Sequence, residues 1–149
     1  MKTIIKKTSV DNIDMDTINQ AGEIIRQGGL VAFPTETVYG LGADALNEEA
    51  AAKIYAAKGR PSDNPLIAHI ADLEMLKPLV EEIPPVAEKL MDAFWPGPMT
   101  LIFNKSNLVP KGTTGGLDTV ALLHRHLLRR LVLVLRHQVL TFQENQARL

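Results

Sequence analysis

Cysteine is absent from this sequence of 149 residues. The chain therefore cannot form a disulfide framework, a zinc-thiolate site or a cysteine nucleophile, and its natural compartment is a reducing one. No stretch approaches the roughly 18 apolar residues of a transmembrane helix. The first eight residues are too few, and too interrupted by charge, for a secretory signal. We therefore expect a cytoplasmic protein that neither spans a membrane nor is exported.

The composition is typical of one soluble globular domain. Hydrophobic residues make up 46% of the chain and charged residues 22%, and the formal net charge is −1. This balance excludes disordered and collagen-like chains. The length is sufficient to bury a sizeable core if the whole sequence folds as one domain.

The composition changes abruptly after Ala121. Residues 1–121 contain 11 basic and 16 acidic residues with all ten glycines and all nine prolines, whereas residues 122–149 contain five Arg, one Glu and nine Leu but no Lys, Gly or Pro. The two parts carry net charges of −5 and +4. Because one evolved domain rarely changes its residue usage at a single position, we predict a domain over 1–121 and a basic Leu/Arg/His-rich tail over 122–149.

Helical and extended patterns alternate along residues 1–121. Asn47 suits the N-cap of a helix that Gly59 ends, because its side chain can accept a free backbone N–H. We expect helices over residues 14–27, 47–58, 72–80 and 84–94, and strands over residues 30–33, 66–70, 99–103 and from 118 onward. This alternation predicts an α/β fold in which helices flank a twisted sheet of mixed parallel and antiparallel strands.

The first segment that could carry chemistry runs from Phe33 to Gly42, where we expect a loop that leaves a buried strand. Its two threonines, one glutamate and two glycines can place polar groups at the mouth of a cleft, as ligand loops on open sheets do. An ordinary turn rich in threonine and glycine is the alternative, and both interpretations are open from the pattern alone.

A second segment, from Lys58 to Pro65, is a proline-flanked loop after a helix C-terminus. Lys58 and Arg60 would point two cations into one space, and an arginine can bind phosphate oxygens through two hydrogen bonds, which favours a polyphosphate ligand. The glycine spacing and the Lys-Ser/Thr pair of a P-loop are missing. The alternative is that Lys58 only caps the helix and Arg60 is solvated.

His69 stands among apolar residues of an expected strand. A single histidine there is more often a packed, hydrogen-bonded core residue than a catalyst. A zinc site needs partners at ligand spacing, and residues 1–121 contain none, so we predict no metal site built from the protein alone. Trp95 and the prolines beside it are typical of a structural turn.

In this order and spacing, these segments resemble the YrdC-like family, the threonylcarbamoyl-AMP synthases that act in tRNA modification. The resemblance covers roughly residues 10–121. Each motif alone is a weak signal, and the resemblance is specific because the motifs occur in the same order along the chain. The motifs are Phe33–Gly42, Lys58–Pro61, Asn64–Leu66, the strand around His69, Trp95–Leu101 and Gly116–Ala121.

The resemblance implies an ATP-dependent condensation of L-threonine and bicarbonate to threonylcarbamoyl-AMP and pyrophosphate. Partner proteins would then use this product to modify the adenosine beside the anticodon of tRNA. By resemblance, Thr37 and His69 contact threonine, and Lys58, Arg60, Asn64 and Thr119 contact ATP, with Lys58 and Arg60 as the catalytic pair. Mg²⁺ would accompany the phosphates. Such a reaction needs no protein nucleophile, so the lack of cysteine is no obstacle.

Two other functions stay open. Members of the family are also described as binding double-stranded RNA on a basic concave face, and a non-catalytic RNA-binding or ribosome-maturation module is the alternative to catalysis. The net charge of −5 over residues 1–121 means that such a face would need local clustering of cations. A carbamoyl-phosphate-using transferase subunit is a further enzyme class, although such chains carry long additional domains.

The sequence departs from the family pattern after Ala121. The family continues with an arginine, here at the position of Leu123, and later with a Ser-x-Asn block that completes the site, and this chain has neither. One interpretation is a frameshifted or otherwise aberrant translation from about residue 122, which leaves the fold incomplete and the enzyme with little activity. The other is a genuine basic amphipathic helix for a partner, an RNA or a membrane surface. Residues 131–135 are equally typical of an aggregation-prone strand, and we expect poor solubility.

Overall fold

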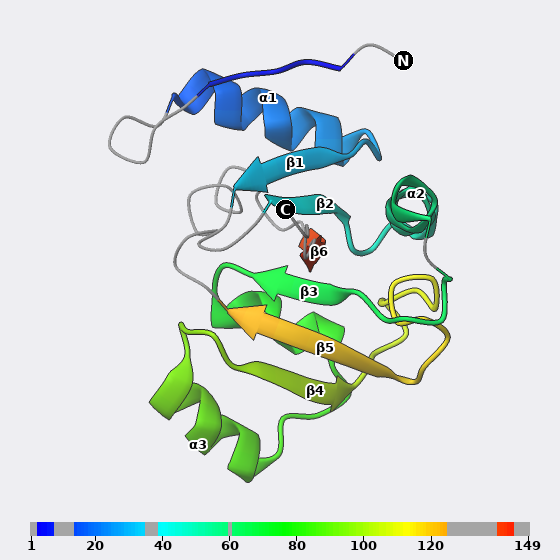
Figure 1. Ribbon diagram of the computed structural model, residues 1–149. Helices are drawn as coiled ribbons and strands as arrows, with labels where there is room; N and C mark the ends of the chain where they lie inside the picture. Colours follow the sequence, from blue (N-terminus) through cyan, green and yellow to red (C-terminus); the bar gives the residue numbers. More distant parts are fainter. Residues whose placement is uncertain (1–2, 8–13, 35–38, 60, 125–139, 145–149) are drawn as a thin grey trace.

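A six-stranded mixed sheet organises the residues that the computed structural model describes, which are 3–7, 14–34, 39–59, 61–124 and 140–144 (Figure 1). The elements in chain order are α1 (Met15–Arg26), β1 (Val31–Pro34), β2 (Tyr39–Asp44), α2 (Glu48–Lys58), β3 (Ile67–Ile70), the 3-10 turns η1 (Leu73–Met75) and η2 (Lys77–Leu79), α3 (Pro85–Phe94), β4 (Thr100–Asn104), β5 (Thr119–His124) and β6 (Leu140–Glu144). The strand order is β1-β2-β6-β3-β5-β4. β3 and β5 are parallel, and the other neighbouring strands are antiparallel.

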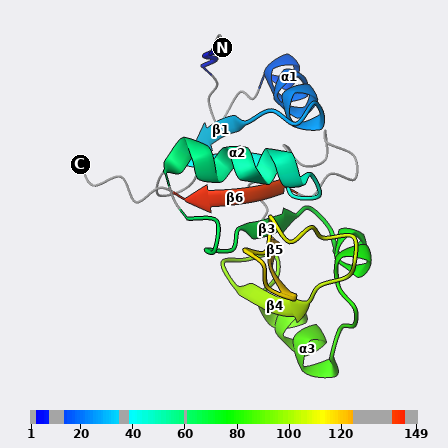
Figure 2. The same cartoon turned by 90° about the vertical axis from the view of Figure 1, so that its right-hand side faces the viewer.

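Helices lie at both ends of this sheet. α1 packs against β1 and β2, and α2 packs against β2. In Figure 2, α1 lies next to β1 at the top of the view. α3 lies beside β4 at the opposite end (Figure 1). The expected α/β architecture with a mixed sheet is therefore confirmed.

The core lies mainly on one face of the sheet. Ala68 and Ile70 of β3, together with Val120 and Leu122 of β5, belong to the larger cluster of buried side chains. Because successive strand residues point to opposite faces, the residues between them face the other way. A smaller cluster joins β2, α2 and the start of β3 through Ala43, Ala50, Ala51, Ile54, Tyr55 and Leu66.

Local capping explains where the helices begin and end. Asn47 Oδ1 accepts a 3.1 Å hydrogen bond from the amide of Ala50 at the start of α2. Gly59 ends this helix with a left-handed φ of 60°, a conformation that glycine adopts at little cost. The expected helices over 14–27, 47–58 and 84–94 and the four expected strands are confirmed to within a few residues.

The turn predicted at Trp95 is also confirmed. The indole Nε1 of Trp95 donates a 2.6 Å hydrogen bond to the carbonyl oxygen of Met99, which closes the turn before β4. The amide of Gly97 donates to the carbonyl oxygen of His124 at 2.9 Å and ties the same turn to the end of β5.

The helix predicted over residues 72–80 is wrong. The segment forms two short 3-10 turns, η1 and η2, instead of one α-helix. Pro78 lies inside it and has no amide hydrogen to donate, which disfavours a continuous helix. Val80 is extended and forms an isolated β-bridge with Lys105, so the segment ends by joining the sheet.

The prediction of a loop after the strand that ends at Phe33 is wrong at Pro34 and over Tyr39–Gly42, which belong to strands. β1 and β2 pair as antiparallel strands, with Phe33 opposite Gly40 and Val31 opposite Gly42. A Cβ on Gly40 would lie only 2.8 Å from Cζ of Phe33, so this glycine makes room for an aromatic ring across the strand pair. Residues 35–38 lie outside the described residues.

Residues beyond Ala121 also contribute strands. β5 continues to His124, and β6 pairs with β2 on one side and β3 on the other. Residues 125–139 and 145–149, which include the ambiguous segment 131–135, are outside the described part of the chain. The predicted domain boundary at Ala121 stays a prediction. In the part of the chain that is described, no helix combines the length and apolar character needed to cross a bilayer.

Candidate functional site

Thr119 and His69 share the sheet face that points away from the larger core. In the parallel β3–β5 pair, Ile67 is level with Ala121 and His69 is level with Leu123. The same register places Thr119, at the start of β5, level with the residues that lead into β3. His69 therefore lies about 13 Å further along the sheet than Thr119, at the usual rise of a strand. His69 is 6% exposed.

Lys58 and Asn64 lie at the same end of this strand pair as Thr119. Lys58 is the half-buried last residue of α2, and Asn64 is exposed in the loop that leads to β3. The hydroxyl of Tyr55, one helical turn before Lys58, donates a 2.9 Å hydrogen bond to the carbonyl oxygen of Asn64. Three of the predicted ATP contacts thus gather at the N-terminal ends of β3 and β5, whereas His69, the predicted threonine contact, is deeper along β3.

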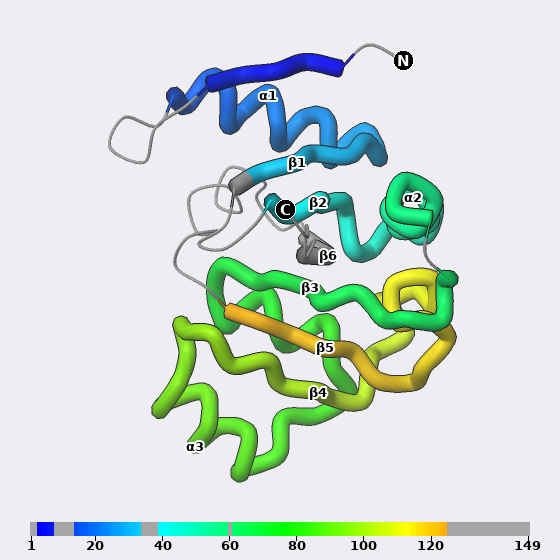
Figure 3. Tube along the Cα trace, in the orientation of Figure 1, coloured from blue at the N-terminus to red at the C-terminus, as the bar shows by residue number. Residues whose placement is uncertain are grey.

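The turn over residues 111–116 holds this end of the sheet together, and Figure 3 traces it beside the start of β3. Its Thr113 is fully buried, and its hydroxyl donates a 2.6 Å hydrogen bond to the carbonyl oxygen of Ala45. The carbonyl oxygen of Thr113 accepts a 3.0 Å bond from the amide of Leu66. The amide of Gly112 donates a 3.0 Å bond to Oε1 of Glu48 in α2. One turn therefore links the end of β2, the start of α2 and the start of β3.

Two ionisable side chains near this end have displaced pKa values. Burial raises the pKa of the Tyr55 hydroxyl, and the negative charge of Asp63 raises it further. Burial also raises the pKa of Asp44 at the end of β2, and the hydrogen bond from the amide of Leu46 opposes this effect. Tyr55 consequently remains a protonated hydrogen-bond donor at neutral pH.

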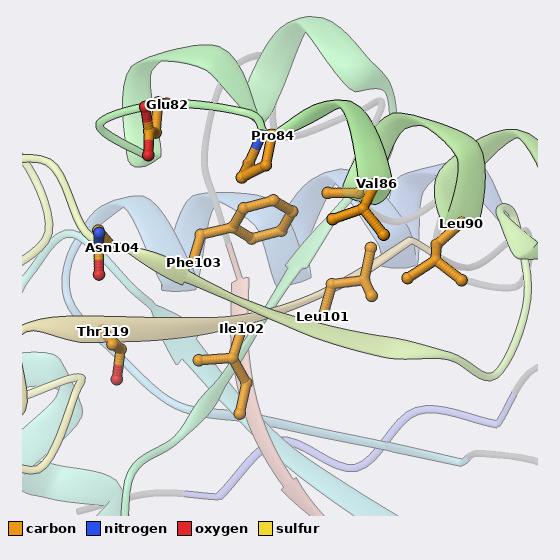
Figure 4. Close-up of a pocket in the computed structure, with 10 residues that line it drawn as sticks. Glu82, Pro84, Val86, Leu90, Leu101, Ile102, Phe103, Asn104 and Thr119 are labelled. Carbon is orange, nitrogen blue, oxygen red and sulfur yellow. The ribbon is translucent and has the colours of Figure 1, made fainter.

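A pocket of about 300 Å³ lies at the other edge of the sheet, between α3 and β4 (Figure 4). Leu101 and Phe103 point toward α3, whereas Ile102 and Thr119 lie on the opposite side of β4 in this view. Of the predicted site residues that the structure describes, Thr119 lines this pocket and Lys58, Asn64 and His69 do not. The pocket is lined mainly by apolar side chains and shares only Thr119 with the cluster of Lys58, Asn64 and Thr119.

The structure does not place every predicted site residue. Thr37 and Arg60 lie outside the described residues, so their relation to the cluster stays a prediction. Three further residues contact the loop around Asn64 or the start of β3 and were not predicted from the sequence: Tyr55, Thr113 and Gly115. Two signals were available for them: the spacing of one helical turn between Tyr55 and Lys58, and the double glycine at 115–116.

The described residues contain no group of three or more His, Cys, Asp or Glu side chains arranged to hold a metal ion.

A family model and individual relatives of known name match this chain. The family model Sua5/YciO/YrdC, whose description reads "Telomere recombination", matches residues 23–137. The threonylcarbamoyl-AMP synthase of Pyrococcus abyssi is 60% identical over 111 residues, which are 74% of this chain and 33% of that protein. The threonylcarbamoyl-AMP synthase of Bacillus subtilis is 55% identical over 106 residues, which are 70% of this chain and 31% of that protein.

A solved structure has the same fold. The crystal structure of P. abyssi Sua5 complexed with L-threonine superposes with a TM-score of 0.83 at 50% sequence identity, over 89% of this chain and 39% of that one. The present chain spans about a third of the length of the two curated relatives that it matches.

Proposed function

This chain belongs to the Sua5/YciO/YrdC family, as its colinear motifs predict, and from this premise we propose that it binds the substrates of threonylcarbamoyl-AMP synthesis. The substrates are ATP, L-threonine and bicarbonate, and the products are threonylcarbamoyl-AMP and pyrophosphate. The match covers only 33% of the P. abyssi protein and 31% of the B. subtilis protein that carry the name threonylcarbamoyl-AMP synthase, so the complete reaction is part of the proposal.

The observation that carries the proposal is the gathering of Lys58, Asn64 and Thr119 at one end of the β3–β5 pair, with His69 further along the same face. A cation and neutral hydrogen-bonding groups at one end suit the phosphates and sugar of a nucleotide. A buried histidine about 13 Å away suits the smaller amino-acid substrate. This separation would let an amino acid approach the α-phosphate of ATP from the side of His69.

The proposed chemistry needs positioning more than it needs a reactive side chain. The amine of threonine adds to the carbon of bicarbonate-derived CO₂ and loses a proton, which gives a carbamate. A carbamate oxygen then forms a bond to the α-phosphorus of ATP, and the bond from that phosphorus to the bridging oxygen breaks, so that pyrophosphate leaves. Lys58, and Arg60 by resemblance, would neutralise the negative charge that builds up on the phosphate oxygens.

Mg²⁺ enters this proposal as part of the MgATP substrate. Mg²⁺ prefers phosphate oxygens and water to a dedicated cage of protein ligands. The absence of a three-ligand cluster among the described residues is compatible with this arrangement. When bound, the ion would screen the triphosphate charge and so assist the departure of pyrophosphate.

Downstream, we propose that the adenylate passes to proteins that modify the adenosine beside the anticodon of tRNA. A carbamoyl adenylate is a mixed anhydride, which is activated for transfer to an amine. The acidic balance of residues 1–121, with a net charge of −5, disfavours tight RNA binding by this part of the chain.

The experiment is an assay of pyrophosphate release from ATP in the presence of L-threonine and bicarbonate. It compares this chain with one whose sequence after Ala121 is restored to the family pattern, including the arginine and the Ser-x-Asn block. Omission of threonine or of bicarbonate is the control, because the proposed reaction requires both. Isothermal titration with ATP and with threonine measures the two binding steps separately.

We expect binding of both substrates by this chain and faster turnover by the restored chain. Turnover by both chains would mean that the missing residues are dispensable. Failure of both chains to bind ATP and threonine would refute the proposed function, and salt-sensitive RNA binding in their place would favour the non-catalytic alternative.

A further inference from the structure

The loop that leads from α2 to β3 contacts two other parts of the chain around Asn64. It contains Asn64, which the proposed function assigns to ATP, and it follows directly on Lys58 at the end of α2. Contacts that fix the backbone of this loop come from Tyr55 on the helix side and from the 111–116 turn on the other side.

Tyr55 fixes the loop on the helix side. Its side chain is 5% exposed, and it belongs to the smaller buried cluster with Ile54 and Leu66. Its hydroxyl is the donor of the 2.9 Å hydrogen bond to the Asn64 carbonyl oxygen. Because Tyr55 and Lys58 are three residues apart on one helix, they lie on the same helical face. The hydrogen bond therefore sets the separation between the Lys58 backbone and the Asn64 backbone.

The 111–116 turn fixes the loop on the other side. Gly115 has a φ of +62°, and a Cβ built on it would lie 2.9 Å from the carbonyl oxygen of Asp63 and 3.1 Å from the nitrogen of Pro65. A side chain at position 115 would therefore collide with the loop backbone on both sides of Asn64, so only glycine fits there. The bond from the Leu66 amide to the Thr113 carbonyl oxygen holds the end of the loop in the same place.

We propose that Tyr55 is a positioning residue for the nucleotide: its hydroxyl holds the Asn64 backbone at a fixed distance from Lys58, so that both groups meet one ATP molecule. This inference rests on the proposed function and adds a residue to its site. Tyr55 does not touch the substrate in this arrangement. Its raised pKa supports the role, because the hydroxyl stays protonated and keeps donating through neutral and mildly alkaline pH.

The test is the variant Tyr55→Phe, which removes the hydroxyl and keeps the buried ring. Loss of one neutral hydrogen bond should weaken ATP binding about fivefold. Threonine affinity should not change, because His69 is further along β3 and is not linked to this loop by the hydroxyl. The matched control is Ser106→Ala, which removes a 2.6 Å hydroxyl-to-carbonyl bond to Pro78 at a distant part of the fold.

Amide hydrogen exchange provides a second readout that does not depend on ligand. Exchange of the amides at residues 62–64 and 66 should become faster in Tyr55→Phe and stay unchanged in Ser106→Ala, while the amides of β4 stay equally protected in both. If Tyr55 contributed only to stability, Tyr55→Phe would lower the melting temperature and would weaken the binding of ATP and of threonine equally.

The two proposals fail in different ways. If the unmodified chain binds ATP and Tyr55→Phe binds it equally well, the role of Tyr55 is refuted and the proposed function stands. If neither the unmodified chain nor the restored chain binds ATP and threonine, the proposed function is refuted, and the exchange readout still tests whether Tyr55 holds the loop. Equal loss of ATP and threonine affinity, or unchanged exchange at residues 62–64 and 66, would also overturn the positioning role.

Discussion

Thr113 and Ala45 are 68 positions apart in the sequence, and the Thr113 hydroxyl donates a 2.6 Å hydrogen bond to the Ala45 carbonyl oxygen. Thr113 is 0% exposed and Ala45 is 1% exposed, so water cannot replace either partner. The bond ties the turn that precedes β5 to the end of β2. It thereby connects the two halves of the sheet outside the strand ladder.

Thr113→Val should lower the free energy of unfolding by about 1–3 kcal/mol, because the buried Ala45 carbonyl oxygen loses its donor while the side-chain shape is kept. Denaturant titration followed by circular dichroism measures the difference. The control is Thr100→Val on β4, where the threonine is exposed and the same change should have little effect. An equal loss in both variants would show that the cost comes from the valine itself.

Asp44→Asn should raise the free energy of unfolding at pH 7. Burial raises the pKa of Asp44 in the folded state, so the ionised carboxylate is less stable there than in the unfolded chain. The contribution of such a carboxyl group to the free energy of unfolding is most favourable below its pKa in the unfolded chain. It is lost as the pH rises through its pKa in the folded state. The advantage of asparagine should therefore shrink as the pH is lowered from 7 toward 4.

Chemical denaturation at pH 7, 5.5 and 4.5 measures this trend. The amide oxygen of the substituted side chain can still accept the bond from the Leu46 amide, which is 2.9 Å long with aspartate. Asp92→Asn is the control. The Asp92 side chain is exposed on α3, so this variant makes the same chemical change without a buried carboxylate. A constant difference across the three pH values for Asp44→Asn would contradict the expected mechanism.

The parts of the fold that follow local rules could be predicted from the sequence. Asn47 and Gly59 mark the ends of α2 through contacts within a few residues, and short apolar runs mark the strands. The β1–β2 pair was missed because Gly40 and Gly42 are typical of loops. Their presence in a strand depends on the ring of Phe33 on the facing strand, which no local pattern contains.

The candidate site also contains residues that the sequence predicts and residues that it does not. Lys58, Asn64 and Thr119 were predicted through a resemblance of motifs in order, and the fold brings them to one end of the β3–β5 pair, although their contacts with ATP stay a prediction. The residues that hold this end were not found. Thr113 has its partner 68 positions away, and the hydroxyl of Tyr55 contacts a backbone oxygen, which any residue at position 64 would supply.

Lys58→Met should weaken ATP binding about 10- to 100-fold, the usual cost of losing a charged hydrogen bond to phosphate, and should leave threonine binding unchanged. The residual affinity should also depend less on salt. Titration calorimetry with ATP and with threonine at two salt concentrations measures both effects. Lys89→Met on the exposed surface of α3 is the matched control. ATP affinity that falls equally in both variants would indicate a general effect of charge and would remove Lys58 from the site.

His69→Leu should abolish measurable threonine binding and leave ATP binding within about twofold, because the change removes both ring nitrogens and keeps an apolar side chain in a buried position. His124→Leu is a close control. His124 is also buried, but it lies on β5 on the core face, where its Nε2 is 2.9 Å from the Ala71 carbonyl oxygen and its ring meets Trp95 edge to face.

Both leucine variants remove a buried imidazole from neighbouring strands, so both should lower the melting temperature. Only His69→Leu should change the affinity for threonine, because the pleat of the sheet turns the two histidines to opposite faces. Thermal unfolding and threonine titration on the two variants separate stability from binding. If His124→Leu loses threonine as completely as His69→Leu, the loss follows from destabilisation of the β3–β5 pair, and His69 has no direct part in holding the amino acid.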